Sequence, residues 1–96
     1  EIINYFKDLD QNTTLVDGNA LLSDAFEKFE LENDADLFDA NTMSGWVIEY
    51  LGLIPPAGYQ FDYKNLSIEV LKSTVKRVLQ IKVVVNEKVA NDDTEE

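Results

Sequence analysis

The sequence predicts an α+β fold, a mostly antiparallel sheet of four or five strands with two helices packed on one face. The first observation is that residues 43–51 have the apolar period of an amphipathic helix. The second is that apolar and polar residues alternate over residues 59–70, on both sides of a short turn at Lys64 and Asn65. The third is similar alternation over residues 77–85. A helical period followed by strand periods around short turns favours antiparallel strands with one face buried under helices.

Two short strands around a polar turn are predicted near the N-terminus, at residues 2–6 and 13–17. Residues 8–12 supply the turn, because they are rich in Asp and Asn. A short helix is predicted over residues 21–29, where apolar residues recur with helical spacing. Asn19 is the expected cap of this helix.

An acidic segment, residues 30–39, interrupts the helical period and predicts an exposed loop in which Leu37 and Phe38 turn inward. Its carboxylates are candidate ligands for a divalent cation, since hard cations prefer oxygen ligands. A solvated acidic loop that leads to the positive end of a helix is the favoured alternative. The candidate metal-ligating residues are Glu32, Asp34, Asp36 and Asp39.

The most regular helix is predicted over residues 43–51, with Asn41 or Thr42 as its cap and Gly52 as its left-handed end. Gly45 lies inside its first turns, and close packing against the sheet is the expected reason. Two prolines then stiffen the connection to the strands. The apolar stripe of this helix consists of Met43, Trp46, Val47, Tyr50 and Leu51.

The C-terminal half predicts an antiparallel meander with strands near residues 59–63, 66–70 and 77–85. Strict alternation in the last strand places Val78 and Val84 on its outward face. The opposite face then consists of Arg77, Leu79, Ile81, Val83 and Val85. The polar, acidic residues 86–96 predict a disordered tail, so the domain is assigned to residues 1–85.

Composition excludes several functions. The 96 residues suffice for one small domain, and the start at Glu1 without a methionine indicates a piece of a longer protein. Without cysteine or histidine the chain forms no disulfide, thiolate zinc site or imidazole-based triad. A formal net charge of -11 disfavours nucleic acid and anionic membranes as partners. No apolar run approaches the roughly 20 residues of a membrane span, so direct membrane insertion by this domain is not expected.

No combination of residues predicts catalysis or a cofactor, so we expect a domain that is not an enzyme. Residues 8–12 begin like an EF-hand loop, but the glycine and the bidentate glutamate of such a loop are missing. The glycine spacing fits no phosphate-binding loop. No pair of the many acidic residues is singled out for acid–base chemistry by its setting.

Four residues remain as candidates for a ligand site or an interface. Trp46 and Tyr50, with the aromatic residues of the segment 59–63, could line a pocket, although a role in the core is favoured. Lys76 and Arg77 form the only adjacent basic pair of the sequence and could bind an anion or a partner's carboxylate. A solvent-facing strand start, or protection of a sheet edge, explains this pair equally well.

Several pieces of the sequence resemble one known family. Leu-Val-Asp-Gly at residues 15–18 precedes the first helix, residues 42–52 are followed by Leu-Ile-Pro and by Gly58, and strands at residues 66–71 and 75–85 close the chain. In this order and spacing they resemble the transporter-associated domain, also called the CorC/HlyC C-terminal domain. The chain departs from the family pattern where Ser44 replaces a usual glycine, a change expected to matter little to the fold.

The resemblance implies a non-catalytic accessory domain at the C-terminus of an ion transporter that contains a pair of CBS domains. Such proteins are named as magnesium and cobalt efflux proteins or as hemolysins. The implied partners are the CBS pair and the membrane domains of the same full-length protein, on the cytoplasmic side of the bacterial inner membrane. The implied role is to modulate ion transport through domain contacts. The family fold is also similar to part of the FAD-binding domains of certain oxidases, a likeness of shape that implies no flavin.

Two other functions stay open at this stage. A small-molecule or divalent-metal sensor would need a pocket beside Trp46 and Tyr50, or a carboxylate cluster at Asp34, Asp36 and Asp39. A homodimerisation module would pair the last strand of one copy with that of another across a dimer.

Overall fold

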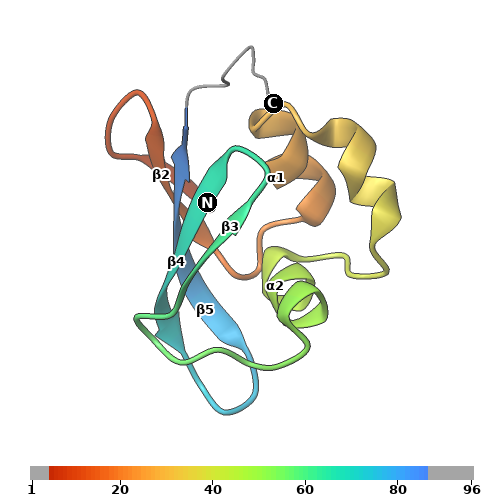
Figure 1. Cartoon of the computed structure of the whole chain (residues 1–96), viewed down its shortest axis with the longest axis vertical. Coiled ribbons are helices and arrows are strands. Elements are labelled where there is room, and N and C mark those ends of the chain that lie inside the picture. The colour runs from red at the N-terminus through yellow and green to blue at the C-terminus, as the bar shows by residue number, and fades with distance from the viewer. Residues whose placement is uncertain (1–4, 87–96) are drawn as a thin grey trace, which may run out of the picture.

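The sheet has five antiparallel strands in the order β1-β2-β5-β4-β3 within residues 5–86, the part of the chain that the computed structural model describes (Figure 1). The strands are β1 (Phe6–Asp8), β2 (Thr13–Asp17), β3 (Gln60–Tyr63), β4 (Leu66–Ser73) and β5 (Val78–Val85). The helices are α1 (Leu22–Lys28), the 3-10 helix η1 (Glu32–Leu37) and α2 (Met43–Leu51). The predicted α+β class and antiparallel sheet are therefore confirmed.

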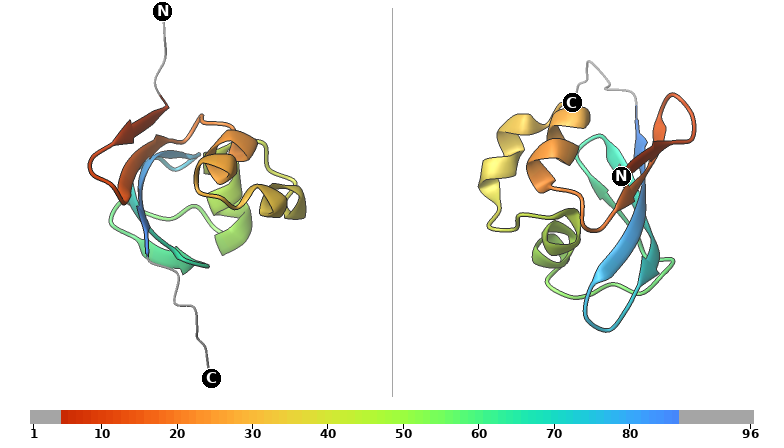
Figure 2. Two further views of the ribbon diagram at one scale, coloured as in Figure 1. Left: turned by 90° about the horizontal axis from the view of Figure 1, so that it is seen from above. Right: turned by 180° about the vertical axis from the view of Figure 1, so that it is seen from behind.

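The helices lie together on one side of the sheet, and no helix of residues 5–86 covers the other side, called the open face below (Figure 2). The core fills the space between these layers. Alternate strand residues such as Val16, Ile68 and Ile81 point into it, together with apolar residues of α1 and α2. Its largest fully buried side chains are Trp46 and Phe26.

The N-terminal region differs from its prediction in three details. The first strand runs over Phe6–Asp8, and residues 2–4 of the predicted strand lie outside the described residues. The cap of α1 is Leu21, with no side-chain hydrogen bond, so Asn19 as its cap was wrong. The acidic segment contains the short helix η1, and its Leu37 is 68% exposed while Phe38 packs against the core.

The first residues of α2 fix this helix to the sheet. Thr42 caps α2 by accepting a hydrogen bond from the Gly45 amide, and Gly52 ends it in the left-handed conformation, as predicted. Packing of Gly45 against the sheet was wrong, because a Cβ there would meet Ala40 and Thr42 instead. Ser44 is the residue that approaches the strands, and its hydroxyl accepts a hydrogen bond of 2.9 Å from the Val78 amide.

Gly18 completes this junction between α2 and the sheet. Its carbonyl accepts a 2.9 Å hydrogen bond from the Ser44 amide, and its own amide donates to Leu79 at 2.9 Å. A Cβ on Gly18 would overlap the carbonyl oxygen of Val78. The Leu-Val-Asp-Gly segment thus ends in the residue that lets β2 and β5 approach α2.

The alternation of β5 changes phase near its start. β4 has one more residue than β5 between the Val70–Ile81 pair and the Lys72–Gln80 pair. Before the next pair, β5 has the extra residue, Leu79. Such irregularities shift which residues face the core. Val78 is consequently buried and Leu79 is partly exposed, so their predicted faces were wrong, whereas Ile81 and Val83 face the core as expected.

The last strand is a central strand, because β5 lies between β2 and β4. A strand with partners on both sides cannot pair across a dimer, so the predicted pairing of β5 was wrong. Among the described strands, β1 and β3 form the two edges of the sheet. Of the predicted tail, residues 87–96 lie outside the described residues. Asn86 is described, and its backbone amide donates to the Asn65 carbonyl at 2.7 Å. Its side-chain amide donates to the Ser67 hydroxyl at 2.8 Å.

Candidate functional site

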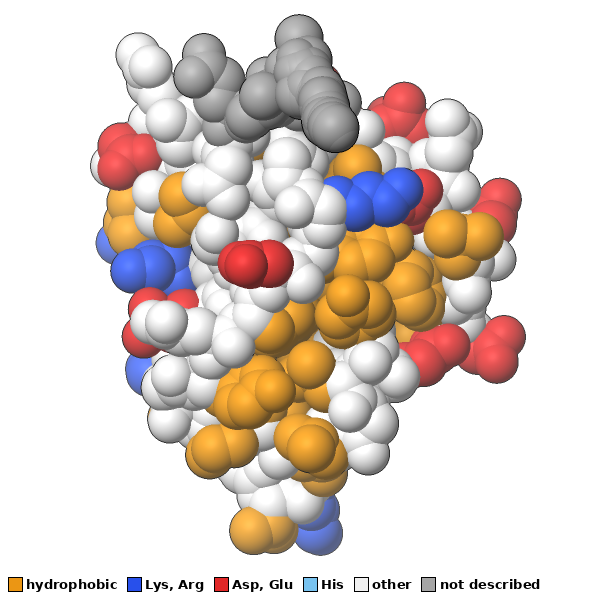
Figure 3. Space-filling view, viewed as in Figure 1, with side chains coloured by type: hydrophobic (Ala, Val, Ile, Leu, Met, Phe, Trp, Pro, Cys, Tyr) orange, Lys and Arg blue, Asp and Glu red, His pale blue; other side chains and the backbone are white. Residues whose placement is uncertain are grey.

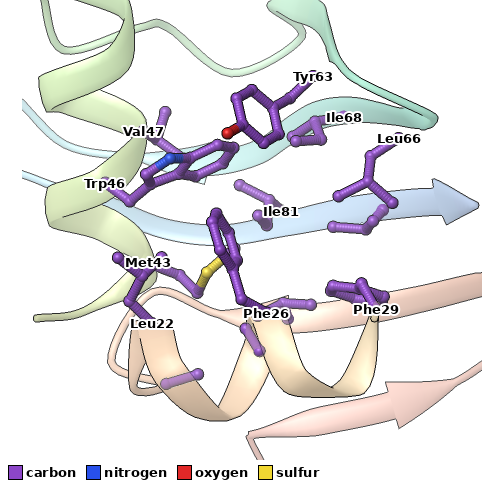
Figure 4. Packing of buried hydrophobic residues seen from close by; sticks show 14 of the residues in the cluster. Leu22, Phe26, Phe29, Met43, Trp46, Val47, Tyr63, Leu66, Ile68 and Ile81 are labelled. Atoms are coloured by element: carbon purple, nitrogen blue, oxygen red, sulfur yellow. The ribbon is translucent and has the colours of Figure 1, made fainter. Parts of the chain in front are cut away.

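An array of aromatic rings extends from the core to the surface. Trp46 lies at its centre and is fully buried (Figure 4). Its ring meets Phe26 and Tyr63 edge to face, with centroids 5.3 Å apart in both cases, and stacks on Tyr50 at 5.7 Å. Tyr50 in turn lies 5.8 Å from Phe61 of β3. Such offset and edge contacts stabilise a cluster beyond simple burial.

The two predicted aromatic candidates play different parts in this array. Trp46 belongs to the core, and its indole nitrogen has no hydrogen-bond partner among the described residues. Tyr50 covers one face of the indole and is itself 43% exposed. The packed rings occupy the space beside Trp46 and Tyr50 in which a ligand pocket was considered from the sequence. Because only Tyr50 of this pair is exposed, it is the one that a partner can contact directly.

A polar link joins η1 to the hairpin of β3 and β4. The Tyr63 hydroxyl donates to the Asp34 carboxylate at 2.8 Å, and the Lys64 ammonium lies 2.8 Å from the same oxygen. The Lys64 and Tyr63 hydrogen bonds hold the pKa of Asp34 below its usual value. Burial, together with the Asp34 charge, raises the pKa of Tyr63 to about 12. These groups satisfy one another, which is typical of a structural contact.

The predicted metal-ligating residues do not converge. Asp34 is engaged with Tyr63 and Lys64, while the Asp39 amide and the Ala40 amide donate to the Glu49 carboxylate. Within residues 5–86 no group of three or more acidic residues is placed to hold a metal ion. Asp36 lines a shallow groove between α1 and η1, apart from the Asp34 carboxylate that Lys64 holds.

The basic pair lies in the turn between β4 and β5. The Arg77 guanidinium donates to the Asn19 side chain, and the Lys76 amide donates to the Thr74 hydroxyl at 3.1 Å. Lys76 is exposed, and the neighbouring Val75 is 90% exposed. Arg77 thus ties the turn to the loop before α1, whereas the Lys76 side chain is exposed, and the binding of an anion or a partner's carboxylate by this pair stays a prediction.

Exposed apolar side chains continue the aromatic array over the surface. Figure 3 shows hydrophobic side chains gathered in a band on the face seen in Figure 1. We call Tyr50, Tyr59 and Phe61 the aromatic edge. Phe61 lies in the outer strand β3, Tyr59 directly precedes this strand, and Tyr50 packs against Phe61. Leu53 and Ile54, 49% and 36% exposed, follow α2. No function was expected of Leu53 or Ile54 from the sequence, and their position directly after the Gly52 helix end was the available signal.

The open face of the sheet carries a shallow polar hollow of about 250 Å³ over β3, β4 and β5. Lys82 and Glu69 form an ion pair of 3.4 Å within it. Its other polar lining residues are Gln60, Asp62 and Ser67. Carboxylate, amide and ammonium groups on a flat surface can bind a polar partner, and no activated nucleophile or paired acid and base accompanies them among the described residues.

Among the described residues, no helix combines the length and apolar character required to cross a membrane.

A family model described as transporter associated domain, CorC_HlyC, matches residues 7–87. No curated protein matches the chain.

Solved structures with the same fold include domains from three bacteria. A hemolysin domain from Enterococcus faecalis is 30% identical, with 88% of this chain and all of that domain covered and a TM-score of 0.73. The transporter associated domain of a CBS domain protein from Porphyromonas gingivalis is 25% identical, with 88% and 100% covered and a TM-score of 0.72. A CorC_HlyC domain from Nitrosomonas europaea is 21% identical, with 88% and 100% covered and a TM-score of 0.76.

Proposed function

Because this chain belongs to the family of transporter-associated (CorC/HlyC) domains, we propose that it is a non-catalytic accessory domain of a CBS-domain ion transporter and modulates transport through domain contacts. The observation that carries this proposal is the family match over most of the chain. The domain from Porphyromonas gingivalis, which has the same fold, comes from a CBS domain protein.

Two features of the described residues support a role in binding other domains. The aromatic edge and its aliphatic neighbours Leu53 and Ile54 offer exposed apolar surface, which in small domains marks interaction sites. The chain has no cysteine or histidine, and the half-buried carboxylate of Asp34 is held by Tyr63 and Lys64.

The partners in this proposal are the CBS pair and the membrane domains of the same full-length protein, on the cytoplasmic side of the bacterial inner membrane. Modulation requires that the domain contact these partners differently in two states of the transporter. The domain itself then needs no bound cofactor, and the transported ion is a magnesium or cobalt type of cation, in line with the proteins that carry such domains.

Deletion of residues 7–87 from the parent transporter, with the CBS pair left intact, tests the proposal. We expect normal membrane insertion but an altered rate or altered regulation of ion efflux from loaded vesicles. A parent protein with Tyr50→Ser, which keeps the fold, provides a milder version of the same change. Efflux and regulation that stay unchanged after the deletion would contradict the proposal.

The sensor alternative is separated by thermal unfolding of the isolated chain with and without Mg²⁺ or Co²⁺. A ligand present at 100 times its dissociation constant stabilises the folded state by about 2.7 kcal/mol. We expect no such shift, because the candidate carboxylates Asp34, Asp36 and Asp39 do not converge. A saturable shift that Asp34→Asn abolishes would favour the sensor instead.

A further inference from the structure

The outer edge of β3 exposes backbone hydrogen-bonding groups. β3 is the last strand of the sheet, with β4 as its only neighbour among the described residues. The Val70 amide donates to the Tyr59 carbonyl at 2.8 Å, and Phe61 is paired with Ile68. In an antiparallel pair, successive residues direct their amide and carbonyl groups alternately toward and away from the partner. Gln60 and Asp62 therefore direct theirs away from β4.

The side of this edge that faces the helices is apolar. Phe61 packs against the core, with its ring 6.2 Å from that of Tyr59 and 5.8 Å from that of Tyr50. Tyr50 and Tyr59 are 43% and 38% exposed. An added strand would place every second side chain on this side, where an aliphatic group would cover the rings.

The opposite side of the same edge is polar and acidic. Gln60 and Asp62 are exposed at the rim of the polar hollow on the open face. Asp62 forms no ion pair with any residue in the described part of the chain, whereas Glu69 behind it is paired with Lys82. The alternate side chains of an added strand would meet the Asp62 carboxylate, so a cation is the complementary group.

From this arrangement we infer that β3 binds an extended segment of a partner, added to the sheet edge, in which lysine or arginine alternates with aliphatic residues. The inference rests on the proposed function, because it names the surface and the kind of segment through which the domain would contact its neighbours. A second copy of β3 is a poor occupant, since it would bring Asp62 toward Asp62 in a chain of formal net charge -11.

The test uses the whole 96-residue chain and two labelled synthetic peptides, one alternating lysine with valine and one alternating glutamate with valine. Fluorescence anisotropy at low salt measures the affinity of each. We expect saturable binding of the lysine peptide and at least about tenfold weaker binding of the glutamate peptide, because both the edge and the net charge favour cations. Added salt should weaken the lysine peptide's binding.

Variants separate edge pairing from general attraction to an acidic protein. Gln60→Pro removes an outward-facing amide without breaking the ladder to β4, and we expect about tenfold weaker binding from the lost hydrogen bond and the blocked edge. Gln60→Ala is the matched control and should bind like the original chain. Tyr50→Ser should weaken binding through loss of apolar contact, whereas Val75→Ser, at an exposed apolar residue in the turn between β4 and β5, should not.

Equal binding of both peptides, or unchanged binding by a folded Gln60→Pro variant, overturns the inference. Sedimentation in the absence of peptide adds a further check. A concentration-dependent mass that Gln60→Pro abolishes would mean that another copy occupies the edge, for example through β1 with its Phe6 and Lys7, and this also overturns it. If the peptide assay fails while deletion of the domain still alters transport, the docking surface is wrong and the proposed function stands.

Discussion

The two ends of α2 contact their surroundings in opposite ways. At the first end, the Ser44 amide donates to Gly18 and its hydroxyl accepts from Val78, and all of these groups are buried against the sheet. At the other end, Tyr50 and the following Leu53 are partly exposed. The buried hydrogen bonds at the first end therefore fix the position of the helix. The other end is then able to present apolar side chains without loss of the fold.

The sharpest test of this contrast uses the stacked pair in the middle of the helix. Trp46→Ala should lower the free energy of unfolding by about 3–5 kcal/mol, because it empties the centre of the aromatic array. Tyr50→Ala should cost about 1 kcal/mol, since this ring is 43% exposed and its contacts with Trp46 and Phe61 lie at the surface of the array. Urea unfolding followed by circular dichroism measures both, and Trp46→Phe provides a folded control. Equal losses for Trp46→Ala and Tyr50→Ala would remove the distinction between the two ends.

Two glycines give the next largest effect. Gly18→Ala should cost about 3 kcal/mol, because the new Cβ would overlap the Val78 carbonyl and force β5 away from α2. Gly52→Ala should cost about 1 kcal/mol, because its left-handed backbone is strained but no atom lies in the way. Calorimetric unfolding of the two variants decides this. A Gly52 variant that loses as much stability as the Gly18 variant would contradict the assignment of the tight contact to the first end.

The pH dependence of stability tests whether the Tyr63 side chain, which lies beside Tyr50, is shielded from water. The ring of Tyr63 lies 5.2 Å from that of Tyr50, and its pKa is raised from 10.0 to about 12. The folded state therefore keeps the Tyr63 proton to higher pH than the unfolded state does. Its contribution is fully present below pH 10 and is lost as pH rises through 12, a loss of up to about 2.7 kcal/mol.

Urea unfolding at a series of alkaline pH values measures this loss, and spectroscopic titration of tyrosinate gives the pKa directly. Tyr63→Phe should remove most of the alkaline decrease. Asp34→Asn should lower the pKa of Tyr63, because the Asp34 charge raises it. A Tyr63 that titrates with the exposed tyrosines would show that water reaches the underside of this end of α2.

A more local effect is expected from Ser44→Ala, about 1–2 kcal/mol, because the Val78 amide would stay buried without an acceptor. Thr42→Ala should cost a similar amount through loss of the cap, yet leave Val78 untouched. Hydrogen exchange at the Val78 amide separates the two. Exchange should accelerate in the Ser44 variant alone, and equal protection in both variants would contradict the role of this serine.

The local elements were predictable because each has its own sequence signal. The period of α2, its Thr42 cap and its Gly52 end are determined by neighbouring residues, and so is the two-residue turn at Lys64 and Asn65. The buried role favoured for Trp46 follows from its place on the apolar stripe, and the structure confirms it. The sequence favoured a solvated loop for the acidic run, and within that run Asp34 contacts Tyr63 and Lys64.

Features that depend on distant partners were not predictable. Strict alternation gave the wrong faces for Val78 and Leu79, because the phase change arises where β4 and β5 each carry an extra residue. The importance of Ser44 was underestimated, since its acceptor role requires that Val78 lie opposite it. The aromatic edge depends on β3 being an outer strand, which no local pattern reveals.

The central place of β5 also has a consequence for how the protein is made. β2 and β4 pair on either side of β5, and within residues 5–86 β5 is synthesised after the other four strands. Until it emerges, the N-terminal hairpin and the β3–β4 hairpin have no strand to join them, so the sheet closes only after β5 has been made. A message truncated before Val78 would release two unjoined hairpins with bare edges, a substrate for proteases and not a smaller version of the domain.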